Sequence, residues 1–332
     1  MKGRVTITFI VLTLLTVLLL LVDIGAGSVK LSIGEVAKAL IGESEDPAVS
    51  KIVIDIRLIK SIVAILTGAA LPISGLQMQT MFRNPLAGPY VLGVSSGASL
   101  AVALFILGLP GLGLPSGIMS TIGMTGAALL GSGIVLALVA VVGRRIKDIM
   151  VVLILGMMVS SGISAIVQIL QYMSSDEALK SFVMWTMGSL GNVTSEQLPI
   201  LLAVVFIGLV LAVATIKSLN LLLLGEEYAI TMGYNSRRGR TMILMSTALL
   251  AGGVTAFCGP IGFIGLALPH VARAIFRSAD HRILIPGVAL TGAAVMLGCD
   301  IVSKILVTPI NAITALIGIP IVIWIVFRQR AI

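Results

Sequence analysis

The sequence predicts an all-α membrane protein of about ten transmembrane helices. Of its 332 residues, 58% are hydrophobic and only 11% are charged, which leaves too few polar groups to cover a water-soluble globule. A helix needs about 20 apolar residues to cross the roughly 30 Å hydrocarbon core, and such runs recur along the chain. They lie at 5–24, 58–81, 91–109, 117–142, 149–172, 198–216, 241–258, 261–277, 283–303 and 308–327. We therefore expect one transmembrane domain over residues 1–332.

The first span also resembles a cleavable signal, because two basic residues precede it and Ala26-Gly27-Ser28 follows it. Its apolar stretch, at 5–22, is longer than the roughly 7 to 15 residues of a signal core. We therefore expect it to be a membrane helix.

The turn after the second span contains residues that end helices. Asn84-Pro85 stops the span, because the residue before a proline avoids helical geometry, and Arg83 favours the cytoplasmic side. Gly93 and Gly97 then open the third span with a spacing that lets helix backbones approach closely in lipid. Similar steps follow in the next two spans, at Ala127 with Gly131 and at Gly156, Ser160 and Ser164.

The residues Gly93-Val94-Ser95-Ser96-Gly97 also fit the G-x-S-x-G pattern of serine hydrolases, with His270 as a candidate base. That pattern requires a preceding strand, whereas the flanks here are typical of membrane helices. An intramembrane hydrolase that uses Ser95 and His270 is therefore kept only as an alternative.

Two outer loops contain amphipathic segments that are too short or too polar to cross. Ser32 with Glu35, and Ser174 with Glu177, each fit the capping box, in which a hydroxyl and a carboxylate bind free amides at a helix start. The second leads to Trp185, which suits an interfacial anchor or a contact for a ligand that enters from outside.

A third short helix is predicted in an inner loop, at about 225–234. It has an acidic first turn, an apolar edge and a glycine stop, formed by Glu226, Glu227, Ala229, Ile230, Met232 and Gly233. A helix of about two turns cannot cross a bilayer. It either lies on anionic lipid or inserts into a partner protein.

The eighth span begins with residues that interrupt helices. Gly259, Pro260 and Gly262 fall within four positions, and broken backbone at membrane depth is tolerated where protein buries it or where it lines a water-filled cavity. The segment is either a tight turn between two helices or a hinge on a pathway.

The distribution of charge predicts that both termini are cytoplasmic. Ten spans with both ends inside place most of the 22 lysines and arginines in inner loops, and most acidic residues in outer loops. The net charge of +8 is thereby explained by topology, and we expect no nucleic-acid partner.

Several chemical groups are missing from the sequence. The spans carry no acidic residue in their interiors, with Asp23 and Asp300 near span ends, which argues against an ion-coupled carrier. No G-x-x-x-x-G-K-[ST] loop is present to hold nucleotide phosphates, and Cys258 and Cys299 have no metal-ligand spacing. We expect no catalytic residue, metal or bound cofactor, so uphill transport would need an energy-supplying partner.

Four stretches, in this order, resemble the FecCD or BtuC-like family of permease subunits of bacterial ABC importers for iron chelates, haem and vitamin B12. They are GAALPISGLQMQTMFRNPLAGPYVLGVSSGAS, LGEEYAITMG, CGPIGFIGLALPHVAR and DHRILIPGVALTGAAVMLGCDIVSKI. The resemblance implies a BtuC-like (type II) importer permease of the inner membrane, with ten helices and cytoplasmic termini.

The resemblance also implies partners. Two copies of an ABC ATPase, which use ATP and Mg, would bind inside, a substrate-binding protein would bind outside, and a second permease subunit, expected to be identical, would complete the pathway. An iron siderophore is the expected cargo, with haem or cobalamin as alternatives.

The resemblance assigns roles to particular residues. The short helix would couple to the ATPase, through Gly225, Glu226, Glu227, Ala229, Met232 and Gly233. Binding-protein docking is implied for Arg57, Lys60 and Lys304, and the cytoplasmic gate for Asn84, Leu86, Asp148, Ile149 and Met150. Gly259, Pro260 and Gly262 would form the broken-helix hinge.

The chain departs from the family pattern in two places. Two of the docking positions carry Lys where Arg is common, which loses bidentate geometry, and Lys304 follows Asp300 by four residues, so a local helix ion pair is the alternative. The stretch VTPINAITALIG lacks the acid that usually precedes the final helix, so no role of that acid is assigned here.

Overall fold

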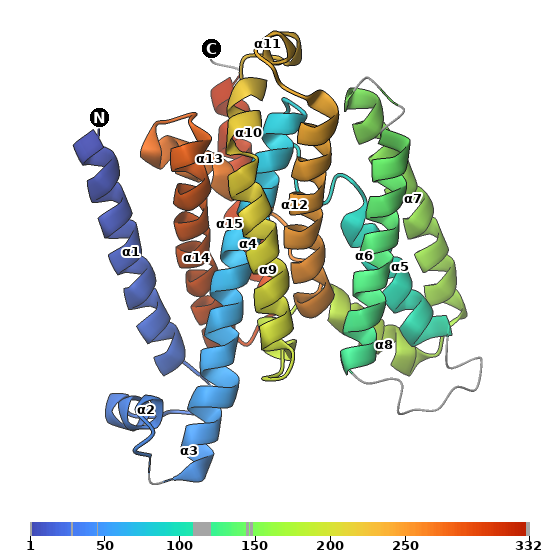
Figure 1. Cartoon of the computed structure of the whole chain (residues 1–332). Helices are drawn as coiled ribbons and strands as arrows, with labels where there is room; N and C mark the ends of the chain where they lie inside the picture. The colour runs from blue at the N-terminus through green and yellow to red at the C-terminus, as the bar shows by residue number, and fades with distance from the viewer. Residues whose placement is uncertain are drawn as a thin grey trace.

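The computed structural model describes residues 2–27, 29–44, 46–108, 121–143, 146 and 149–329. Each of the ten predicted ranges contains a helix, and Figure 1 shows these helices side by side in one bundle. They are α1 (Lys2–Gly25), α4 (Ile59–Met81), α5 (Val94–Ala103), α6 (Thr121–Gly143), α7 (Ile149–Met173), α9 (Leu198–Ala214), α12 (Ser236–Cys258), α13 (Ile264–Phe276), α14 (His281–Leu306) and α15 (Ile310–Gln329). The described part of the chain contains no strand.

The helices differ in length. By length and hydropathy alone, α1, α7, α12 and α14 qualify as membrane spans. A fifth qualifies if α9 and α10 (Ile216–Leu222), which meet at a bend of 50°, are taken together. A π-helical segment, η2 (Leu104–Gly108), follows α5 directly and lengthens that helix. The ten predicted ranges are therefore helical, while length and hydropathy alone mark four or five of them as spans.

Short elements lie at both ends of the bundle. Figure 1 places α2 (Ile33–Leu40), α3 (Pro47–Lys51) and α8 (Asp176–Thr186) at one end, and α11 (Glu226–Thr231) at the other, where α1 begins. The helix at the second predicted span, α4, starts earlier than predicted, because α3 and η1 (Ile52–Leu58) continue into it without a break. The helical segment therefore begins at Pro47, ahead of the apolar run at 58–81 that defined the predicted span.

One predicted capping box is confirmed and the other is wrong. In α2 the Ser32 amide donates to Glu35 Oε2 at 2.7 Å and the Glu35 amide donates to Ser32 Oγ at 3.2 Å. In α8 the cap is Ser175, whose hydroxyl accepts from the Ala178 amide, whereas the predicted Ser174 donates to the Gln171 carbonyl at 2.9 Å. Either of the two adjacent serines could have capped α8; Ser174 instead bonds to the last turn of α7.

Glycines hold the central helices close together. A side chain on Gly97 or Gly131 would collide with the other helix at the crossing of α5 and α6, so the predicted small-residue steps are confirmed there. A second crossing, of α4 with α14 at Gly68 and Gly292, is equally tight and was not predicted. The helix α4 lies at the centre of the bundle, in contact with α9, α12, α13 and α14.

Candidate functional site

The short helix α11 is bounded by two glycines in conformations that other residues rarely adopt. Gly225 has φ +101° and Gly233 has φ +87°, on either side of α11. These torsions reverse the chain at both ends, so six helical residues project from the bundle as predicted (Figure 1).

The two glutamates that open α11 have different surroundings. Glu226 receives hydrogen bonds from Arg240 Nη2, at 2.5 Å and 2.6 Å to its two oxygens, and from Ser236 Oγ at 2.6 Å. These contacts fasten α11 to the first turns of α12. Glu227 is exposed. From the sequence we expected both glutamates to form one exposed acidic turn, but only Glu227 is exposed.

The predicted apolar edge is divided in the same way. Ala229 is fully buried, which corrects its expected place on the displayed surface, whereas Ile230 is 53% exposed and Met232 is 60% exposed. Tyr228, which is 71% exposed, joins them and was missed. Its position four residues before Met232 was the available signal, because residues four apart share a helix face.

Tyr234 packs between α11 and α12. Its amide donates to the Ala229 carbonyl at 2.9 Å, and its ring covers Gly239 so closely that a β-carbon there would collide with it. Burial, reinforced by the nearby Glu226 charge, raises the pKa of Tyr234 to about 12. Its hydroxyl has no hydrogen-bond partner within the described residues.

The turn at 83–87 is held by a hydrogen bond within it and by a contact with α13. Arg83 adopts φ +48° after the last residues of α4, and the Leu86 amide donates to Asn84 Oδ1 at 2.9 Å. His270 Nε2 lies 2.8 Å from the Pro85 carbonyl oxygen. Leu86 is 48% exposed, so its side chain projects from a turn whose position is fixed.

The second half of the predicted gate is only partly described. Asp148 lies outside the described residues, as does the side chain of Ile149, the first residue of α7. Met150 is 42% exposed. The grouping of these residues with Asn84 and Leu86 stays a prediction.

The local structure at Ser95 is not that of a hydrolase. Gly93 follows a series of turns, and Ser95 lies in the first turn of α5. His270 contacts the carbonyl of Pro85. The strand-to-helix elbow that the motif requires is absent from this part of the described chain.

The predicted break lies between α12 and α13. Gly259 adopts φ +74° and Phe263 adopts φ +65°, and the residues between them are not helical. The Gly262 amide donates to Asn311 Oδ1 at 3.0 Å, and Tyr90 donates to the Ile261 carbonyl at 3.0 Å. The segment is a turn between two helices, as one of the two interpretations had it, and its role as a hinge stays a prediction.

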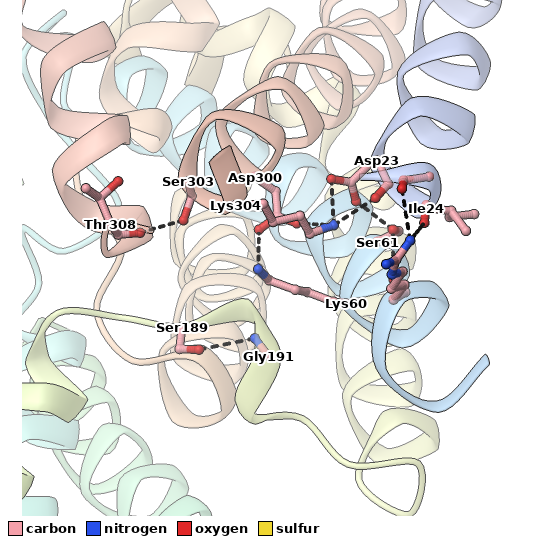
Figure 2. Close-up of polar contacts among 12 residues, drawn as sticks. Asp23, Ile24, Lys60, Ser61, Ser189, Gly191, Asp300, Ser303, Lys304 and Thr308 are labelled. Atoms are coloured by element: carbon pink, nitrogen blue, oxygen red, sulfur yellow. Dashed lines mark hydrogen bonds and ion pairs between the residues drawn. The ribbon is translucent and has the colours of Figure 1, made fainter. Parts of the chain in front are cut away.

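At the opposite end of the bundle, charged residues from three helices meet (Figure 2). Lys304 Nζ lies 2.8 Å from Asp23 Oδ1 and 2.9 Å from Asp300 Oδ2, and Lys60 Nζ lies 2.9 Å from Asp300 Oδ1. Ser61 donates to Asp23 Oδ2 at 2.6 Å. Both carboxylates are buried. We call these five residues the outer charge network; the predicted Asp300–Lys304 helix pair is part of it.

Arg57 lies beside the network and is almost entirely enclosed. It is 4% exposed, and its guanidinium donates to the carbonyl oxygens of Ile24, Gly25 and Val29. The side chain of Lys304 is 9% exposed and that of Lys60 is 22% exposed. The three predicted docking residues are thus near one another but already paired within the chain, and Lys60 is the most accessible. Their docking role stays a prediction.

A cavity of about 590 Å³ opens next to this network. Its walls include Lys60, Asp300 and Lys304 together with Met184 and Trp185 of α8. It combines paired charges with polarizable apolar side chains at the end of the bundle away from α11 (Figure 1). Trp185, for which the sequence left an interfacial anchor or a ligand contact open, is buried and lines this wall, and its contact with a ligand stays a prediction.

Comparison with known proteins places the chain in a family. The model of the FecCD transport family matches residues 14–328. The chain is 36% identical to the hemin transport system permease protein HmuU of Yersinia pestis, over 99% of this chain and 98% of that protein. It is 32% identical to the vitamin B12 import system permease protein BtuC of Klebsiella pneumoniae, over 83% and 82% of the two chains.

A solved structure agrees with the sequence relatives. An inward-facing transporter described as of the metal-chelate ABC type superposes with a TM-score of 0.83 at 31% identity, covering 96% of this chain and 98% of that one. Both the helix arrangement and the sequence are therefore shared over nearly the whole length. The chain belongs to the FecCD transport family, and it is a transporter permease rather than an enzyme.

Proposed function

We propose that the chain is the membrane permease of a binding-protein-dependent ABC importer that moves an iron chelate into the cytoplasm. The observation that carries the proposal is the exposed surface of α11, on a chain related over nearly its full length to importer permeases. Energy comes from two copies of a partner ATPase, which bind ATP and Mg themselves.

The ATPase docks on α11. Tyr228, Ile230 and Met232 expose apolar surface on a projection too short to cross the bilayer. Exposed apolar surface of this kind marks a protein or membrane contact. Because Glu226 and Arg240 tie this helix to α12, a force applied to α11 acts directly on the bundle. This end of the bundle, with both termini, lies in the cytoplasm.

A second, identical copy of the permease completes the pathway. The helix α7 exposes Gln168 and Tyr172 towards its end, on the same face as Ser161 and Ser164, whose hydroxyls donate to carbonyls of the helix itself. Polar side chains are costly against lipid and normally face protein or a water-filled route. We therefore place the second copy, and the pathway between the copies, along this face of α7.

The binding protein delivers the chelate at the other end, over the outer charge network and its cavity. Lys60 offers the accessible positive charge there. Among iron chelates, haem is supported by the 36% identity to a hemin permease, whereas ferric siderophores were expected from the sequence. Cobalamin is the second candidate cargo, supported by the relatives that import vitamin B12.

Reconstitution tests the proposal. The chain is purified with the ATPase and binding protein of neighbouring genes, and ATP hydrolysis in liposomes is measured with hemin, a ferric siderophore or cobalamin on the binding protein. One loaded ligand should stimulate hydrolysis, and the Tyr228→Ala, Met232→Ala double variant should lose ATPase association. The matched control, Phe206→Ala, removes an equally exposed ring from α9 and should retain it. Failure of the intact protein to bind any ATPase would overturn the proposal.

A further inference from the structure

A chain of hydrogen-bonded side chains joins three helices at the α11 end of the bundle. Thr80 Oγ1 lies 2.9 Å from His281 Nε2, and His281 Nδ1 lies 2.8 Å from Asn220 Oδ1. Asn220 Nδ2 donates to Asp280 Oδ1 at 2.7 Å. Thr80 belongs to α4, His281 is the first residue of α14 and Asn220 belongs to α10.

The direction of these bonds follows from the groups that form them. The Asn220 amide oxygen can only accept, so His281 Nδ1 carries a proton and Nε2 of the neutral ring can only accept. The one proton of the Thr80 hydroxyl is shared between two acceptors, this Nε2 and the Leu76 carbonyl oxygen, each 2.9 Å away. The Asn220 oxygen also accepts from the His281 backbone amide at 2.9 Å. Asn220 of α10 is thus bound to both the backbone and the ring of His281 in α14.

The central part of this hydrogen-bonded series is enclosed by the bundle. His281 is 1% exposed and Thr80 is 5% exposed. Loss of one partner would leave a buried polar atom unpaired, which costs more than loss of a surface hydrogen bond. Its three helices are therefore held in one relative arrangement, or must move together.

Two members of this series, Asn220 and Thr80, lie near the two parts of the molecule that transport has to connect. Asn220 is close in sequence to Gly225, where α11 begins, and α10 contacts both α4 and α14. Thr80 is in the last turn of α4, directly before the inner turn at 83–87. One side-chain route from α11 to that turn runs through His281; the Arg83 side chain, whose Nη1 would lie 3.7 Å from a β-carbon on Gly225, approaches α11 directly beside it.

We infer that Asn220, His281 and Thr80 form the link by which movement of α11 reaches the inner turn. His281 is a positioning residue in this link, since it touches neither the ATPase surface nor the pathway. The inference rests on the proposed function, because it assumes that α11 is where the ATPase acts.

Two substitutions at one position test the link. His281→Asn can keep an amide near Nδ1, and so the bond to Asn220, but cannot reach Thr80; His281→Gln reaches toward Thr80 and gives up Asn220. We expect both, and Thr80→Val, to lower uptake per ATP hydrolysed by about fivefold, the ratio that one lost buried hydrogen bond corresponds to. Thr80→Ser keeps the hydroxyl and should restore coupling. The probe is the chelate that stimulates the wild-type complex, from hemin, a ferric siderophore and cobalamin.

Thr247→Val is the matched control. The Thr247 hydroxyl is buried and donates to Gln77 Oε1 at 3.1 Å, between α12 and α4, so the change removes a comparable bond outside the link. It should lower stability and leave uptake per ATP unchanged. Wild-type coupling in the His281 and Thr80 variants, or an equal loss in Thr247→Val, would refute the link while leaving the proposed function intact. A wild-type complex that binds no ATPase would instead remove both.

Discussion

Lys304 Nζ lies 2.8 Å from Asp23 Oδ1, although the two residues are 281 positions apart in the chain. The contact ties the end of α1 to α14, and Ser61 and Lys60 extend it to α4. Buried ion pairs of this kind add little net stability, but breaking one leaves an unpaired buried charge. The outer charge network therefore fixes which helices are neighbours at this end of the bundle.

Removal of the Asp23 charge should destabilise the protein. We expect Asp23→Asn to lower the free energy of unfolding by about 2 kcal/mol, because Lys304 loses one charged hydrogen-bond partner and keeps the other, Asp300. The double variant with Lys304→Met should cost less than the sum of the single changes, which thermal unfolding in detergent can measure as a double-mutant cycle. Asp55→Asn, at an exposed position of η1, is the control and should have little effect. Additive effects at Asp23 and Lys304 would contradict the pairing.

Val307 is in a backbone conformation that suits glycine. It follows α14 with φ +50°, a rare torsion for a β-branched residue, and its side chain is 88% exposed. Val307→Gly should raise the unfolding temperature, because it relieves about 1 kcal/mol of strain without removing buried contacts. Ile305→Gly, which changes another exposed residue but inside the helix, should lower the unfolding temperature. Similar shifts in both variants would show that Val307 is not strained.

Tyr234 should make the stability of the α11 region depend on alkaline pH. Its folded-state pKa of about 12 lies above the ordinary value of 10.0, so its contribution is complete below pH 10 and is lost as the pH rises toward 12. Tyr234→Phe should be neutral or stabilising at pH 7, since the hydroxyl is unpartnered within the described residues, and should reduce the loss between pH 10 and 12. Hydrogen exchange of the α11 amides checks this. Tyr228→Phe, at an exposed position, should behave like wild type; an unchanged alkaline loss in Tyr234→Phe would contradict the prediction.

Lys60 should contribute to capture of the binding protein. Lys60→Met keeps the apolar stem and removes the charge, so we expect slower association and a weaker dependence on salt, with dissociation little changed. Surface plasmon resonance with reconstituted permease measures both rates. Lys51→Met, another exposed lysine near the same end, is the control. Equal effects of the two changes would indicate a general charge effect rather than docking at the network.

Local patterns predicted the elements well. The apolar runs located the helices, Gly225 and Gly233 bounded α11, and Gly259 with Pro260 marked the break before α13. Each depends on the length of an apolar stretch or on the torsions of a few consecutive residues. The cap of α8 was placed one residue too early because two neighbouring serines, Ser174 and Ser175, can each supply a capping hydroxyl, and local pattern does not choose between them.

Local sequence patterns were thus enough to identify a helical membrane protein, to locate its helices and to find the segment that forms α11. The inward positions of Glu226 and Ala229, the enclosure of Arg57 and the contacts by which His281 joins α4 to α10 could be seen only in the folded bundle. The reason is physical: helix length and backbone torsion are set by nearby residues, whereas burial and pairing depend on side chains from distant helices, whose spacing along the chain carries no local signal.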